Sequence, residues 1–183
     1  IAPPKSGTIK TQQGISDIKG YEWLLSNGVR VIVHPDKKLT GDVEVLLRIP
    51  GGLSTDANAR LGEMRWAQRL AESSGYGKSS AAQLQQFSKQ NRVQVMPYAE
   101  LLYHGLQGKA PNDRLEPLFK LFYLKLTAAN FDPAKLEQTK KQFRLSYSKQ
   151  PVERQFLDLI NQNAFNQSRR LLVLPDGPWN QFT

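Results

Sequence analysis

The sequence predicts an α+β fold in which helices pack on one face of a mostly antiparallel sheet. Three observations indicate this fold. Strand-like runs are joined by short turns, helical patterns follow them in groups, and 39% of the 183 residues are hydrophobic. Because hairpins connect neighbouring antiparallel strands, this pattern favours a sheet without parallel crossovers. We expect three strands, two helices, two strands and three helices.

The first predicted hairpin turns at Asn27 and Gly28. Apolar runs over residues 21–25 and 29–34 flank this pair, and Asn-Gly between two such runs is the strongest short hairpin signal. Residues 1–20 contain two adjacent prolines and several glycines but little apolar periodicity, so they are predicted to be an inter-domain linker.

A third strand, a glycine turn and a helix make up the centre of the sequence. The strand covers residues 43–49 and ends at a sharp exit formed by Gly51 and Gly52. Apolar residues then recur at helical spacing until Gly75, at Leu61, Met64, Ala67, Leu70 and Ala71. This pattern predicts a helix that lies against the sheet.

A second helix is predicted from a cap at Ser79-Ser80 to Asn91, followed by strands over 93–97 and 101–106. Gly105 and Gly108 are expected to close this second hairpin. The third helix follows residues 111–113. Its apolar face contains Leu115, Leu118, Phe119, Phe122 and Leu126, and Leu121 and Leu124 widen that face, so the helix is expected to pack on two sides.

A fourth helix is predicted from Asp132-Pro133 to Ser148, with Lys140 and Lys141 facing outward. A fifth begins at Pro151, and its apolar positions are Phe156, Leu159, Ile160 and Phe165. Residues 171–183 should form an irregular tail, which leaves residues 21–170 as the folded domain.

Composition limits the possible functions. The formal net charge of +9 raises acidic partners or nucleic acid as a hypothesis, but basic residues are spread along the chain and no nucleic-acid-binding motif occurs. The absence of cysteine excludes disulfides and zinc–thiolate sites, and it does not decide between a bacterial periplasm and cytoplasm. No apolar run is long enough to span a membrane. Without an initiator Met or a signal segment, the chain is expected to be part of a longer protein.

Four stretches together resemble the pitrilysin/insulinase family of zinc metallopeptidases. They are Trp23–Ile32, Gly51-Gly52, Ser73–Gly77 and Leu106–Gly108. The chain resembles in particular the first domain of the second, non-catalytic half of long bacterial members. The resemblance implies a fold like that of mitochondrial processing peptidase. It also implies a partner, the zinc-bearing catalytic half of the same peptidase, and a peptide substrate enclosed between the two halves.

In the active domains of this family the central helix carries His-x-x-Glu-His, and the matching positions here are Arg65, Gln68 and Arg69. Histidines would supply neutral ligands and the glutamate would activate a metal-bound water. A permanently protonated guanidinium cannot ligate, and Gln68 cannot act as a base. Downstream, Glu137 is expected to pair with Lys141 on the surface. The resemblance therefore implies a domain with no catalytic residues, no metal site and no bound cofactor.

Other candidate sites are weaker. The two histidines, His34 and His104, lack a neighbouring carboxylate in the sequence, and Ser26, Ser54 and Ser79 stand in turn or cap contexts. Two functions remain open: a non-catalytic scaffold and substrate-chamber domain of a zinc peptidase, or a stand-alone basic module that binds acidic partners through residues 135–149. Because family domains contain further strands, this chain is also expected to be incomplete and to self-associate.

Overall fold

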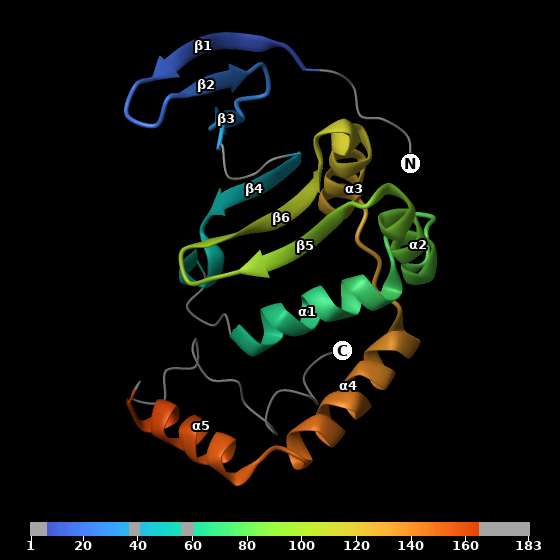
Figure 1. Cartoon of the computed structure of the whole chain (residues 1–183). Coiled ribbons are helices and arrows are strands. Elements are labelled where there is room, and N and C mark those ends of the chain that lie inside the picture. The colour runs from blue at the N-terminus through green and yellow to red at the C-terminus, as the bar shows by residue number, and fades with distance from the viewer. Residues whose placement is uncertain (1–6, 37–40, 56–60, 165–183) are drawn as a thin grey trace.

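The computed structural model describes residues 7–36, 41–55 and 61–164 (Figure 1). Its elements follow in this order: β1 (Ile9–Ile15), β2 (Gly20–Leu25), β3 (Arg30–Val33), β4 (Asp42–Pro50), η1 (Gly52–Thr55), α1 (Leu61–Ser74), α2 (Ala81–Asn91), β5 (Gln94–Ala99), β6 (Tyr103–Pro111), η2 (Asn112–Arg114), α3 (Leu115–Thr127), α4 (Pro133–Ser148) and α5 (Val152–Ala164). This is the predicted order with one additional strand and two short 3-10 turns.

The described strands form two antiparallel sheets where a single sheet was expected. The first has the order β1-β2-β3 and the second the order β4-β6-β5. Figure 1 shows the first sheet at one end of the molecule, the second in the middle, and α4 and α5 at the opposite end. The α+β class and the antiparallel pairing are confirmed, and the single sheet was wrong.

Strand β1 corrects the expectation that residues 1–20 form a linker without regular structure. It pairs with β2 from Ile9 opposite Leu25 to Ile15 opposite Gly20. All its residues before Ile15 are exposed, so the alternation of apolar and polar residues that identifies a half-buried strand is missing. The strand is formed by backbone hydrogen bonds to β2, so the pattern of apolar and polar residues does not predict it.

The structure has a glycine with positive φ at each of the two predicted turns. Asn27 Oδ1 accepts a hydrogen bond from the amide of Val29, and Gly28 has φ of +85°. At the second turn Gly52 has φ of +52°, and a Cβ on it would lie 2.3 Å from the carbonyl oxygen of Glu100. Only glycine fits this close approach between the end of β4 and the β5–β6 turn.

Helices cover one face of the β4-β6-β5 sheet. Its inner rows contain Val95, Leu106 and Ala110, which are buried in one core with residues of α1, α2 and α3. The opposite face carries Leu46 and Met96, which are 60% and 48% exposed. The expectation of helices on one face is therefore confirmed for this sheet.

Helix α3 buries only part of the wide apolar face that was predicted. Leu118, Leu121 and Phe122 are buried, whereas Phe119 is 51% exposed and Leu126 is 49% exposed. The predicted burial of Leu118, Leu121 and Phe122 is confirmed, and the predicted burial of Phe119 and Leu126 was wrong, because α3 packs on the sheet through only one side of its apolar surface. The ring of Phe122 packs over Gly108 of β6, where a Cβ would lie only 2.4 Å from Phe122 Cε2.

Strand β6 continues through both glycines that were expected to end it. Gly108 lies under Phe122, and Gly105 faces the backbone of β4, since a Cβ there would meet the Leu47 carbonyl oxygen at 2.0 Å. Both are glycine because neighbouring groups approach closely, which is a recognised role of glycine inside strands. The strand therefore reaches Pro111 instead of stopping at Leu106.

The remaining helices match their predicted ranges closely. Ser80 caps α2 and forms a capping box with Gln83, as expected for that segment. On α4, Lys141 is exposed as predicted but Lys140 is buried, which corrects its predicted orientation. Among the described residues, no helix is both long and apolar enough to cross a membrane. Phe165 and the predicted tail lie outside the described residues.

Candidate functional site

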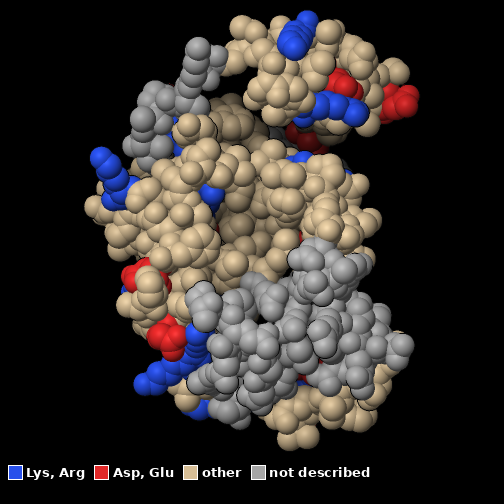
Figure 2. All heavy atoms as spheres, turned by 180° about the vertical axis from the view of Figure 1, so that it is seen from behind, with Lys and Arg blue, Asp and Glu red and all other residues tan. Residues whose placement is uncertain are grey.

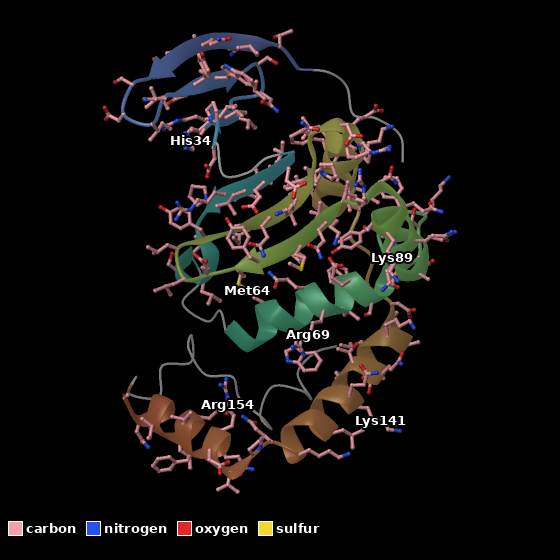
Figure 3. All side chains as sticks on the ribbon, viewed as in Figure 1. His34, Met64, Arg69, Lys89, Lys141 and Arg154 are labelled. Atoms are coloured by element: carbon pink, nitrogen blue, oxygen red, sulfur yellow. The ribbon has the colours of Figure 1, made fainter. Side chains whose placement is uncertain are left out.

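Helix α1 carries Arg65, Gln68 and Arg69, the three residues that the sequence resemblance aligns with the metal ligands and the general base. Its inner face buries Trp66, Leu70 and Ala71. Gln68 is half-buried and Arg69 is exposed, and Figure 3 shows Arg69 on the side of α1 that faces α4. The side chain of Arg65 lies outside the described part of the chain. The surface of α1 therefore has the residue spacing of a metal site, but Arg69 places a guanidinium where the resemblance would put a ligand.

Helix α4 packs beside α1, and Glu137 lies on α4 with an exposed side chain. Glu137 Oε1 lies 2.8 Å from Lys140 Nζ, so its partner is Lys140, and the predicted pairing with Lys141 was wrong. No group of three or more His, Cys, Asp or Glu side chains lies together within the described ranges. The prediction of no metal site stays a prediction that rests on residue chemistry.

The two histidines have separate surroundings. His34 follows β3 of the first sheet and is exposed. His104 lies in β6 of the second sheet, and its Nδ1 accepts a hydrogen bond from the Gly52 amide at 3.3 Å. His104 therefore supports the glycine turn after β4. Of the three serines, Ser54 donates to the Gly51 carbonyl oxygen at 2.6 Å, which agrees with its predicted turn role.

A polar network that sequence patterns did not reveal joins α1, α3 and β5. Glu72 Oε1 accepts hydrogen bonds from Tyr76 Oη at 2.8 Å and from Lys125 Nζ at 2.5 Å. The same ammonium donates to the Val95 carbonyl oxygen at 2.8 Å and lies 5.2 Å from the ring centroid of Tyr76. The Lys125 side chain is 6% exposed, so its charge is compensated by these groups rather than by water.

Burial of the Tyr76 phenol raises its pKa well above the ordinary value, and the hydrogen bond to Glu72 and the negative charge of that carboxylate raise it further. All three causes favour the neutral phenol over the phenolate. Tyr76 is thus a permanent donor to Glu72 at physiological pH. Glu72 in turn holds Lys125 against β5, so the network fixes the relative positions of three elements.

Comparisons with known proteins agree with the resemblance seen in the sequence. No family model matches the chain. A curated relative, the probable zinc protease PqqL of Haemophilus influenzae, is 26% identical over 145 residues, which are 79% of this chain and 16% of the relative.

Solved structures show the same fold at low sequence identity. The periplasmic protease PqqL from Escherichia coli matches the whole chain with a TM-score of 0.70 and 17% identity, over 20% of that protein's chain. The ferredoxin protease FusC, solved as a mutant in complex with Arabidopsis ferredoxin, matches 88% of this chain and 18% of its own, with a TM-score of 0.69 and 21% identity. A peptidase M16 inactive domain from Pseudomonas fluorescens matches 72% of this chain and 32% of its own, with a TM-score of 0.57 and 18% identity.

The chain spans about a sixth of the Haemophilus relative and about a fifth of the Escherichia coli protein. These similarities concern one domain of much longer proteins. The activities named for those proteins therefore do not pass directly to this chain.

Proposed function

We propose that this chain, a domain of the pitrilysin/insulinase (M16) type, is a non-catalytic scaffold and substrate-chamber domain of a zinc-dependent metalloendopeptidase that degrades peptides or small proteins. One observation carries the proposal: the sequence places Arg65, Gln68 and Arg69 where the resemblance would put the ligands and the general base. Guanidinium groups have no lone pair to offer a metal, and their positive charge repels a dication.

The names of similar proteins support the same assignment. The Haemophilus relative is described as a probable zinc protease, and the Pseudomonas structure is described as an inactive domain. Zinc and the general base would then lie in a catalytic half, on the same polypeptide or a neighbouring one. The chemistry supplied there by zinc is activation of water for peptide hydrolysis. The chain described here would complete the space in which the peptide is held.

The alternative, a stand-alone basic module using residues 135–149, has less support. Lys140 of that segment is buried and paired with Glu137, and Lys135 is only half-exposed. On the face seen in Figure 2, basic side chains are separated by uncharged surface and do not form one continuous patch. Sequence-independent binding of nucleic acid depends on neutralising many phosphates at once. Retention on heparin with a steep salt dependence would favour this alternative.

Reconstitution tests the proposal. The catalytic half of the parent peptidase, with an intact His-x-x-Glu-His helix, is assayed on a peptide substrate with and without this chain. The chain alone should cleave nothing, and its addition should raise cleavage by the catalytic half. Replacement of the glutamate in the catalytic helix should abolish cleavage, whereas Arg69→Ala in this chain should not. Zinc-dependent cleavage by the chain alone, or no response of the catalytic half to its addition, would refute the proposal.

A further inference from the structure

A groove of about 960 Å³ lies where β5 begins and β6 ends, between α2 and α3. Helix α2 forms one wall with residues from Ala81 to Lys89, and Arg92 continues that wall beyond the end of the helix. The opposite side is formed by Leu121 and Lys125 of α3. The volume is within the range of sites that hold a small molecule or a few residues of a peptide.

The floor of the groove is apolar. Leu84, Val93, Val95, Ala110 and Leu121 line it, and all five belong to the buried core. Polar side chains stand above them, and Gln85 and Gln94 are exposed. An apolar floor below a polar rim fits a ligand that carries both an apolar group and hydrogen-bonding groups.

Four cations and two carboxylates line the groove, but they are not equally available. Lys109 pairs with Asp42 at 3.3 Å and with Glu44 at 3.4 Å, and Lys125 pairs with Glu72. In each of these ion pairs the carboxylates largely neutralise the lysine.

Lys89 and Arg92 are different. Both are exposed, and neither has an ion-pair partner among the described residues. They lie three positions apart at the end of α2, where the amide of Arg92 donates to the Lys89 carbonyl oxygen and φ of Arg92 is +55°. Figure 3 shows Lys89 extending from α2. Two uncompensated cations on one wall therefore make the groove complementary to negative charge.

We propose that this groove binds a short acidic peptide segment, with an apolar side chain on the floor and a carboxylate at Lys89 and Arg92. The inference rests on the proposed function, because it places a contact for the peptide in the non-catalytic domain. Recognition is by side chains rather than by addition of a strand to β5, since Lys125 already occupies the Val95 carbonyl oxygen.

Binding of a fluorescein-labelled acidic peptide, an alternating Glu-Leu nonapeptide, to the isolated chain tests the proposal by anisotropy. The double variant Lys89→Gln/Arg92→Gln removes two charges from the groove. The control Lys10→Gln/Lys141→Gln removes two charges from exposed positions on β1 and α4. We expect about a tenfold increase in Kd for the groove variant, about 1.4 kcal/mol, and little change for the control.

A second variant tests shape without changing charge. Ala82 lines the groove from an exposed position on α2, so Ala82→Trp should narrow the groove and weaken binding while the helix still forms. A Lys-Leu peptide of the same length should bind much more weakly than the Glu-Leu peptide. Circular dichroism of each variant confirms that the fold is retained.

Three results would overturn the inference: no binding by the unmodified chain, equal losses in the groove and control variants, or equal binding of acidic and basic peptides. Equal losses would mean a delocalised attraction to the basic surface, which salt screens. Because this assay omits the catalytic half, its failure is separable from failure of the proposed function. Stimulation of the catalytic half by a chain that fails here would leave the scaffold role standing.

Discussion

Lys125 Nζ donates a hydrogen bond to the carbonyl oxygen of Val95 at 2.8 Å, and this contact closes an edge of the second sheet. β5 is the strand at that edge and pairs on its other side with β6. Alternate residues of a strand direct their N–H and C=O groups to opposite sides. Pro97 has no N–H that could bond to β6, which fits a position whose backbone groups point to the free edge, and Val95, two residues earlier, points the same way. The Lys125 side chain and Pro97 therefore protect this edge from pairing with a strand of another chain.

Removal of the Lys125 ammonium should expose this edge. Lys125→Met keeps an apolar stem but leaves the Val95 carbonyl oxygen without its partner, which should cost about 1–3 kcal/mol of unfolding free energy. The variant should also sediment as larger species than the unmodified chain at equal concentration. Lys120→Met on the same helix is the control, because Lys120 pairs with Glu116 at the surface. Identical stability and sedimentation of the two variants would show that Lys125 does not protect the edge.

Self-association of the unmodified chain stays a prediction, and the structure offers a surface for it. The apolar positions of α5 are exposed: Val152 by 76%, Phe156 by 61%, Leu159 by 56% and Ile160 by 45%. Such a stripe is typical of a helix that packs against a partner. The chain should form dimers or larger species at micromolar concentration in light scattering, and Phe156→Ser/Leu159→Ser should reduce them. A stable monomer in both cases would contradict the prediction.

The buried and the exposed aromatic residues of α3 should differ sharply in their contribution to the free energy of unfolding. Phe122→Ala removes a buried ring from the core and should cost about 3–5 kcal/mol. Phe119→Ala removes a ring that is half-exposed and should cost about 1 kcal/mol or less. Urea unfolding of both variants measures the difference. Equal losses would contradict the assignment of Phe122 to the core and Phe119 to the surface, and a larger loss for Phe119→Ala would mean that α3 presents its other side to the sheet.

High pH should weaken the fold through Tyr76. Its pKa is raised in the folded chain, so the folded state retains a proton that the unfolded state loses. The contribution of this proton to the free energy of unfolding is complete below about pH 10, the ordinary pKa of tyrosine, and is lost progressively as the pH rises above it. Tyr76→Phe cannot ionise, so its unfolding free energy should fall less steeply above that pH than that of the unmodified chain. Tyr21→Phe, at an exposed position, is the control. Parallel curves for the unmodified chain and Tyr76→Phe would refute this role.

Local signals were sufficient for much of the fold. The Asn27-Gly28 turn, the Ser80 cap of α2 and the ranges of four helices follow from residues close together in the sequence. Local signals fail where a strand has no apolar alternation or where a helix is apolar over more than the side that is buried. β1 is exposed on both faces and carries no apolar alternation, and α3 is apolar over a wide face of which only a part packs on the sheet.

The candidate site shows the same limit. Arg65, Gln68 and Arg69 could be identified because their spacing on one helix is a local property. The contact between Lys125 and Val95 joins residues that are 30 positions apart. The groove likewise combines α2, α3 and two strands. Neither arrangement has a sequence motif, because each depends on how helices pack on the sheet.

Metal analysis of the purified chain tests the central claim, that this domain is non-catalytic. After dialysis against zinc and then against metal-free buffer, the account predicts no stoichiometric zinc and no cleavage of a peptide substrate, since arginine at position 69 cannot ligate. One tightly held zinc per chain that is lost on replacement of His34 or His104, together with zinc-dependent cleavage, would contradict it.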